Sequence, residues 1–190
     1  MSTKRINPTQ QQVAQFTDNC RYLKLQHLSE QYQQMMDKAH EETIGYFEFI
    51  NEVVRAEAAA TRQRRVKNLI RNSHLPQPLK MIPGFDFDFQ PDLDRRLVMD
   101  LATLEFMERN TSVLFMGSNG TGKSHLAQSL ALLACQKEYR TYYTTLSSLI
   151  SDLNTGVYEK TLEKRLRKYI NPELLVIDEM GHDRLELKIS

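Results

Sequence analysis

Cysteine, long apolar runs and internal repeats are scarce or missing in this 190-residue sequence. The only two cysteines, Cys20 and Cys135, form no CxxC pair and no Cys/His cluster, which excludes a zinc site and a disulfide framework. No apolar run approaches the roughly 20 residues that span a bilayer. The basic start of the chain precedes no apolar stretch, so it is not a secretory signal. We therefore expect a cytoplasmic protein with no membrane partner.

An excess of charge of one sign is also missing. The formal net charge is +1, so a nucleic-acid role has to come from a local basic patch. Arg64, Lys67 and Arg71 recur at the spacing of one helical face, opposite the apolar residues of the same helix. This stripe suits a phosphate backbone and equally suits a solvated outer face, so both interpretations stay open.

The first part of the chain is rich in Gln, Glu, Lys and Arg and contains a single glycine before residue 73. From Val13 to Met35 apolar residues recur at three- and four-residue spacing, which predicts an amphipathic helix or a broken pair of helices. A further helix is expected from near Thr43 towards Asn72. Residues 1–75 are therefore predicted to form an all-α N-terminal domain.

Proline and glycine interrupt the chain after that helix. Pro76 and Pro78 end it, because proline lacks the backbone N–H and restricts the residue before it. Pro83 and Gly84 begin a second interrupted stretch. We interpret residues 76–91 as a linker that also enters the second domain.

From residue 92 onwards strand-like and helix-like segments alternate. Buried strands are expected at the apolar runs Ser112–Met116 and Leu174–Ile177, and a β-rich segment at Arg140–Thr145. Helices are expected at Asp94–Arg109, Leu126–Cys135, Leu146–Leu153 and around Leu162, Leu166 and Tyr169. The alternation implies βαβ units and a parallel sheet, so residues 92–190 are predicted to form an α/β core.

One motif carries chemistry directly. Gly117–Ser124 reads Gly-Ser-Asn-Gly-Thr-Gly-Lys-Ser and fits G-x-x-x-x-G-K-[ST] in full. Glycines let the backbone N–H groups point inward around a phosphate, and the helix that follows adds partial positive charge. The alternative is a glycine-rich turn that matches the motif by chance. The position of the motif between an apolar strand and a helix disfavours this alternative.

Each residue of this loop has an expected role. Lys123 is expected to reach the β- and γ-phosphates of a nucleotide, and the Ser124 hydroxyl to bind magnesium. The expected phosphate-binding residues are Gly117, Ser118, Asn119, Gly120, Thr121, Gly122, Lys123, Ser124 and His125.

The apolar run Leu174–Ile177 ends in two acidic residues. Asp178 is expected to hold the magnesium, mostly through its water shell, and Glu179 to polarise the attacking water. The alternative is an acidic strand end that faces solvent. Asp178 and Gly181 superficially satisfy the D-x-x-G of GTPases, but an acidic residue directly after the aspartate is typical of ATPases. The predicted ligand is therefore ATP with Mg²⁺.

Together with their surroundings, these residues resemble the IstB-like ATPases, which are helpers of bacterial insertion-sequence transposition close to the DnaC helicase loaders. The resemblance runs along nearly the whole chain through Leu75-Pro76, Phe85–Phe87, Leu101–Phe106, Gly120–Ala127 and Leu174–Gly181. It implies an AAA+ P-loop core that binds ATP and assembles on DNA, with a transposase as partner. It also implies catalytic roles for Lys123 and Glu179.

The resemblance further implies that the α/β core is incomplete. The chain ends twelve residues after Asp178, where the family continues with two more strands, a sensor residue and an arginine finger. One of those strands would lie between the P-loop strand and the acidic strand, so Val113–Met116 is expected to lack a neighbour on one side. We interpret the chain as a truncated member in which hydrolysis is doubtful, and leave its enzyme status open.

The leading hypothesis is thus an ATP-binding transposition helper that binds DNA and a transposase. A DnaC-type helicase loader, whose partner would be a replicative helicase, is the alternative from the same class. A non-catalytic remnant that acts as an interaction module through its helical N-terminal domain is the alternative from another class. A small-molecule kinase would need a substrate pocket and lid that the sequence does not reveal.

Overall fold

The computed structural model describes residues 8–180 of the chain. The chain divides between Arg64 and Arg65 into two compact units. The predicted domain boundary at residue 75 lies further along, and the chain is helical from Arg64 to Asn72. Within the described residues no helix is long and apolar enough to cross a membrane.

The first unit contains α1 (Gln10–Tyr22), α2 (Gln26–Glu41) and the first part of α3 (Tyr46–Asn72). Thr9 begins α1 with a capping box, because its hydroxyl accepts from the Gln12 N–H and the Gln12 side chain accepts from the Thr9 N–H. The Phe16 and Tyr32 rings, with centroids 5.2 Å apart, join α1 to α2. The expected broken pair of helices is therefore present.

A buried carboxylate links α3 to the start of α2. No side chain at the start of α2 caps this helix. Instead, the Glu57 carboxylate of α3 accepts a hydrogen bond from the Leu28 N–H at 2.7 Å. The same carboxylate accepts from Arg64 at 3.0 Å and from Thr61 at 3.2 Å. Burial alone would raise the pKa of Glu57, yet the hydrogen bonds from Leu28 and Arg64 outweigh it and lower the pKa.

The second unit contains the end of α3 and an alternation of helices with two strands. In order these are η1 (Ile82–Gly84), α4 (Arg95–Ala102), α5 (Glu105–Glu108), α6 (Lys123–Gln136), β1 (Thr141–Thr145), α7 (Leu146–Tyr158), α8 (Leu162–Ile170) and β2 (Leu174–Asp178). The strands β1 and β2 pair in parallel, from Thr141 opposite Leu174 to Thr145 opposite Asp178. The predicted α/β class with a parallel sheet is confirmed.

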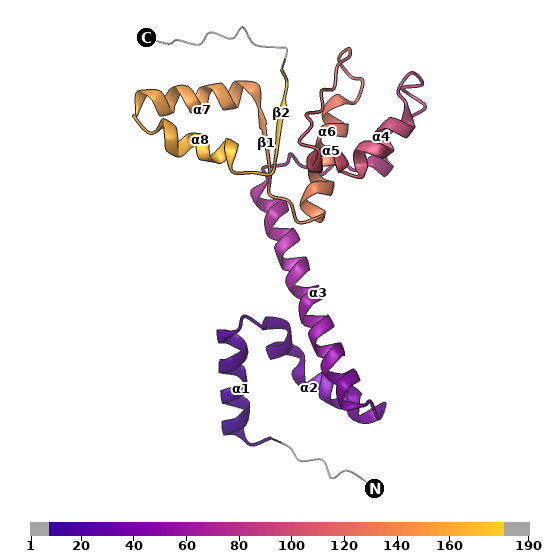
Figure 1. The fold of residues 1–190 in the computed structure, drawn as a ribbon, viewed down its shortest axis with the longest axis vertical. Helices are drawn as coiled ribbons and strands as arrows, with labels where there is room; N and C mark the ends of the chain where they lie inside the picture. The colour runs from indigo at the N-terminus through magenta and orange to yellow at the C-terminus, as the bar shows by residue number, and fades with distance from the viewer. Residues whose placement is uncertain (1–7, 181–190) are drawn as a thin grey trace. The chain divides into compact units, whose positions relative to one another are not determined.

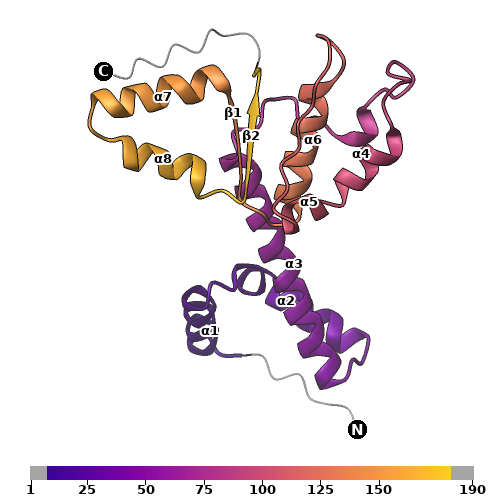
Figure 2. The same cartoon turned by 45° about the horizontal axis from the view of Figure 1, so that its top comes forward.

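Helix α6 is the centre of this unit. It is apolar around most of its circumference and buries Leu126, Leu130 and Ala134 on one side and Ala131 and Leu132 on another. It packs on both strands, whereas α7 packs on β1 and pairs with α8. In both views α7 and α8 lie on one side of the strands and α6 on the other (Figure 1, Figure 2).

The predicted buried strand at Ser112–Met116 is wrong for the described chain. The sheet within residues 8–180 consists of β1 and β2, and no strand pairs with this segment. Leu114 and Met116 are 68% and 82% exposed, while Phe115 packs partly against the core beside α6. The apolar run is present, but a strand also needs a hydrogen-bonded neighbour, and this segment has none among the described residues.

The helix expected at Asp94–Arg109 is divided into α4 and α5. Asp94 caps α4 by accepting from the Arg96 and Leu97 N–H groups. Leu104 then adopts a left-handed backbone with φ 67° and is only 2% exposed. The chain breaks the helix because this turn places Leu104 in the core, and α5 restarts directly after it.

The segment 76–91, predicted to be a linker, contributes to the core of the second unit. Ile82 and Phe85 are buried in the cluster that also holds Val98, Leu126 and Leu130. The segment therefore enters this unit with its apolar residues, and it lies against the start of α6.

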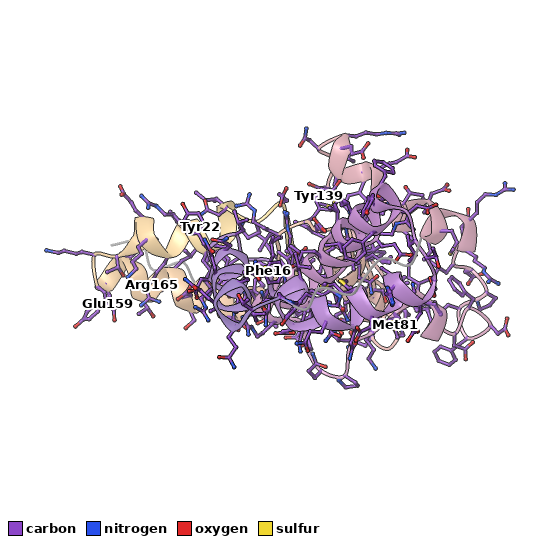
Figure 3. All side chains as sticks on the ribbon, turned by 90° about the horizontal axis from the view of Figure 1, so that it is seen from below. Phe16, Tyr22, Met81, Tyr139, Glu159 and Arg165 are labelled. Atoms are coloured by element: carbon purple, nitrogen blue, oxygen red, sulfur yellow. The ribbon has the colours of Figure 1, made fainter. Side chains whose placement is uncertain are left out.

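An acidic residue holds α7 and α8 together. The Asp152 carboxylate accepts from Arg165, from Lys168 at 3.3 Å and from the Tyr169 hydroxyl at 2.7 Å. The Tyr169 hydrogen bond is the main cause of the lowered pKa of Asp152. Arg165 also pairs with Glu159 at 2.8 Å, and Figure 3 shows these two side chains together at one end of the helical pair. Two of the basic residues near α8 thus serve packing.

Candidate functional site

The loop Gly117–Ser124 follows residues 112–116 and leads into the first turn of α6. Gly120 and Gly122 have φ of 82° and 85°, the left-handed region that side chains disfavour, so the glycines are needed there. Gly122 is the residue before the first turn of α6, and the Thr121 hydroxyl donates to the Ser118 carbonyl at 2.9 Å. The loop is therefore a tight turn that ends at a helix N-terminus.

Phe85, which the sequence reasoning missed, lies directly against the loop. A Cβ atom at Gly122 would come within 2.4 Å of Phe85 Cε2, so the aromatic ring needs a residue without a side chain there. The Phe85 ring also meets the His125 ring at a centroid distance of 5.3 Å. His125, expected in the phosphate cradle, has its Nε2 2.9 Å from the Met81 carbonyl oxygen. The segment 76–91 thus packs against the loop and against the first turn of α6.

Lys123 lies at the start of α6 with its side chain turned back over the loop. Its Nζ donates to the carbonyl oxygens of Gly117 at 3.0 Å and Ser118 at 2.7 Å. An ammonium group held by two neutral carbonyls is available to an anion, because a charged oxygen binds it more strongly. This places the predicted lysine where phosphate oxygens would meet it.

Two predicted magnesium ligands, far apart in the sequence, are brought together. The Ser124 hydroxyl of α6 donates to Asp178 Oδ1 of β2 at 3.0 Å. Both are oxygen donors, and Mg²⁺ is commonly held in proteins by one or two carboxylates together with substrate phosphates. The pair therefore fits the metal that a P-loop site implies.

Asp178 has a second partner that the sequence reasoning did not find. The Tyr143 hydroxyl of β1 donates to Asp178 Oδ2, and the Gln128 side chain of α6 contacts the same hydroxyl at 3.4 Å. Burial, followed by the Asp178 carboxylate, raises the pKa of Tyr143 well above its usual range. Tyr143 therefore stays a neutral hydrogen-bond donor near pH 7.

Glu179 follows β2 with a left-handed backbone, φ 59°. Its N–H donates to Asp178 Oδ1 at 2.9 Å, and its side chain is exposed. The Gly181 of the D-x-x-G pattern lies outside the described residues. The role of Glu179 as the base stays a prediction.

The loop and the end of β2 open into a common cavity. Its volume is about 1130 Å³, and its lining includes Lys123, Ser124, Asp178 and Glu179 together with Phe115 and the residues just before it. The residues expected to act on phosphates thus share one space with access from solvent.

A parallel α/β unit with a full G-x-x-x-x-G-K-[ST] loop before a helix, and an acidic strand end beside it, defines the P-loop nucleotide-binding class. Comparison with known proteins narrows this class. Residues 18–188 match the family described as IstB-like ATP binding protein, and the chain belongs to that family. The resemblance noted from the sequence is confirmed.

The chain is similar to three proteins named as ATP-binding proteins of insertion sequences. It is 38% identical, over 88% of its length, to the ATP-binding protein of IS5376 from Geobacillus stearothermophilus. It is 30% identical, over 88% of its length, to the ATP-binding protein of IS232 from Bacillus thuringiensis subsp. berliner. It is 33% identical over 84% to that of IS21 from Pseudomonas aeruginosa. The matches span 66%, 67% and 60% of these relatives respectively, so the chain covers about two thirds of their length or less.

Proposed function

We propose that this chain binds ATP with Mg²⁺ at the loop Gly117–Ser124, as part of the ATP-dependent helper of an insertion sequence. The observation that carries the proposal is the 3.0 Å contact between Ser124 Oγ and Asp178 Oδ1 beside the ammonium group of Lys123. Family membership and the relatives' names support ATP as the nucleotide.

Each residue has a distinct task in this proposal. The backbone N–H groups of the loop and the N-terminus of α6 bind the phosphates, and Lys123 neutralises their charge. Ser124 and Asp178 hold Mg²⁺, which when bound offsets the negative charge of the phosphates. The Glu179 carboxylate polarises a water for attack on the terminal phosphate.

DNA and a transposase are the partners we propose. The names of the relatives refer to insertion sequences, which favours transposition over helicase loading. Of the basic stripe, Arg64 is paired with Glu57 at 3.0 Å, whereas Lys67 and Arg71 are exposed at i,i+4 spacing in the second unit. We propose that Lys67 and Arg71 contact DNA phosphates.

The test is titration of the full chain with a fluorescent ATP analogue in the presence of Mg²⁺, beside Lys123→Ala. Lys164→Ala, which removes an exposed positive charge from α8, is the matched control. We expect Lys123→Ala to bind at least about tenfold more weakly, because a charge-assisted contact to phosphate is lost. Equal binding by all three proteins would contradict the proposed site.

Phosphate release on the same samples decides the enzyme status. If the wild type releases phosphate from ATP and Glu179→Gln does not, the chain is an ATPase. Binding without turnover would favour a protein that binds ATP and acts through its partners.

A further inference from the structure

Strand register places Tyr143 beside the proposed metal carboxylate. Thr145 is opposite Asp178 and Tyr143 is opposite Val176. Alternate residues of a strand point to the same face, so Tyr143, Val176 and Asp178 share the face on which α6 packs. Tyr142 points to the other face, where its ring meets those of His74 and Tyr169 at centroid distances of 5.0 and 5.6 Å.

The two oxygens of Asp178 have different partners. Oδ1 accepts from the Ser124 hydroxyl at 3.0 Å and from the Glu179 N–H at 2.9 Å. Oδ2 accepts from the Tyr143 hydroxyl. With Oδ2 bonded to Tyr143, Oδ1 is the oxygen that faces Ser124.

Tyr143 is itself held rigidly. The residue is 6% exposed and packs against Leu75, Ala131 and Leu132. Its backbone N–H donates to the Ser73 carbonyl at 2.8 Å, so β1 is anchored at this residue on the edge away from β2. A buried ring on an anchored strand has little freedom to move its hydroxyl.

We propose that Tyr143 is a positioning residue, which holds the Asp178 carboxylate so that Oδ1 is presented to the metal beside Ser124. The inference rests on the proposed Mg²⁺–nucleotide function and adds a residue to it. Metal ligands need orientation within narrow limits, and hydrogen-bonded partners of a ligand supply it. The phenol of Tyr143 does this without contacting the nucleotide.

The test compares Tyr143→Phe with Tyr142→Phe in the full chain. Both substitutions remove one hydroxyl from β1 and keep the ring, but only the first removes a donor to Asp178. Mg²⁺ is titrated at a fixed concentration of fluorescent ATP analogue, and binding is also measured in EDTA. We expect Tyr143→Phe to need roughly tenfold more Mg²⁺ for its half-maximal effect, with metal-free binding unchanged.

A double-mutant cycle with Asp178→Ala separates positioning from packing. If Tyr143 acts through Asp178, Tyr143→Phe has no further effect on Mg²⁺ dependence once Asp178 is alanine. A persistent effect in that background would overturn the proposal, as would a Tyr143→Phe protein whose Mg²⁺ dependence equals that of Tyr142→Phe.

Three further outcomes are decisive. Thermal unfolding shows whether Tyr143→Phe folds. If it does not fold, Gln128→Met is the second variant, because it removes the side chain that contacts the Tyr143 hydroxyl. Gln128→Met should raise the Mg²⁺ requirement by a smaller factor, and no rise would overturn the proposal. A wild-type chain without Mg²⁺-dependent nucleotide binding would refute the proposed function and the Tyr143 role together. Mg²⁺-dependent binding by the wild type with no Tyr143 effect would refute the Tyr143 role alone.

Discussion

Gly122 is subject to two separate constraints, a left-handed backbone and a neighbouring aromatic ring. Gly120 shares the first, with φ 82° against 85°, but nothing lies within 4 Å of the place where its Cβ would be. At Gly122 a Cβ would meet the buried ring of Phe85 at 2.4 Å. Comparing substitutions at these two glycines therefore distinguishes the effect of backbone strain from that of steric overlap.

We expect Gly120→Ala to lower the free energy of unfolding by about 1–2 kcal/mol, the cost of placing alanine in the left-handed region. Gly122→Ala should cost about 1–3 kcal/mol more, because overlap with Phe85 is added. Urea denaturation of both variants checks the difference. Phe85→Leu in the Gly122→Ala background should recover part of the additional loss, and equal stability of the two alanine variants would contradict the steric argument.

At the residue scale, sequence reasoning succeeded where the chemistry is local. The loop residues follow one another, so their spacing alone predicts a turn before a helix, and Lys123 and Ser124 lie at its end. Phe85 and Tyr143 could not be found this way. Their roles depend on contacts with Gly122 and Asp178, which only the packing of η1 and the register of β1 bring about.

At the scale of elements, α2 depends on a residue of another helix for its first turn. Glu57 of α3 accepts from the Leu28 N–H, a donor that no side chain at the entry of α2 satisfies. Arg64 also contacts this carboxylate. The start of α2 is thus stabilised by an ionised group, which makes it sensitive to pH.

Glu57→Gln should lower the stability of the first unit by about 1–3 kcal/mol at pH 7, because the buried, charged acceptor of the Leu28 N–H and of Arg64 is lost. The folded chain depresses the pKa of Glu57 below its ordinary value of 4.5. Its contribution is therefore present above pH 4.5 and is lost as the pH falls through the lower folded pKa. The difference in stability between the wild type and the variant should accordingly become smaller in acid.

Hydrogen exchange at the α2 amides, read from pH 7 downwards, measures this effect. Glu41→Gln, an exposed position at the end of α2, is the control and should leave exchange at Leu28 unchanged. If the difference in Leu28 exchange between Glu57→Gln and the wild type stayed constant below pH 4.5, an ionised Glu57 could not be the cap of α2.

Element prediction from the sequence was limited by tertiary partners. The segments that became β2 and α6 were found because their apolar patterns match their final surroundings, and β1 was found because its Thr and Tyr residues favour a strand. Residues 112–116 have the pattern of a strand but no pairing partner among residues 8–180, and Leu104 breaks a helical pattern to reach the core. Neither the partner of a strand nor the depth of the core can be read from a local window.

At the scale of the whole molecule, charge is nearly balanced, at +1 for the full sequence. Attraction to DNA must then come from the placement of charges and not from their sum. Lys67 and Arg71, exposed on successive turns of α3, are the pair that we propose for this contact.

Replacing Lys67 and Arg71 together by glutamine should weaken DNA binding and reduce the slope of log K against log salt by about 2, because two phosphate contacts are lost. Arg21→Gln with Arg109→Gln is the control. Those arginines pair with Asp18 at 2.7 Å and Glu105 at 2.8 Å, and their removal changes the net charge equally. Binding measured across a salt series should separate the two double variants, and equal slopes would contradict the proposed contact.

The backbone of Glu179 carries a consequence for the evolution of this chain. Its φ of 59° directly after β2 is a geometry that glycine adopts at no steric cost and glutamate adopts at some cost. Selection for thermostability alone would therefore favour glycine at this position. Such a substitution would remove the carboxylate that we propose for water activation, so heat tolerance and chemistry favour different residues at this turn.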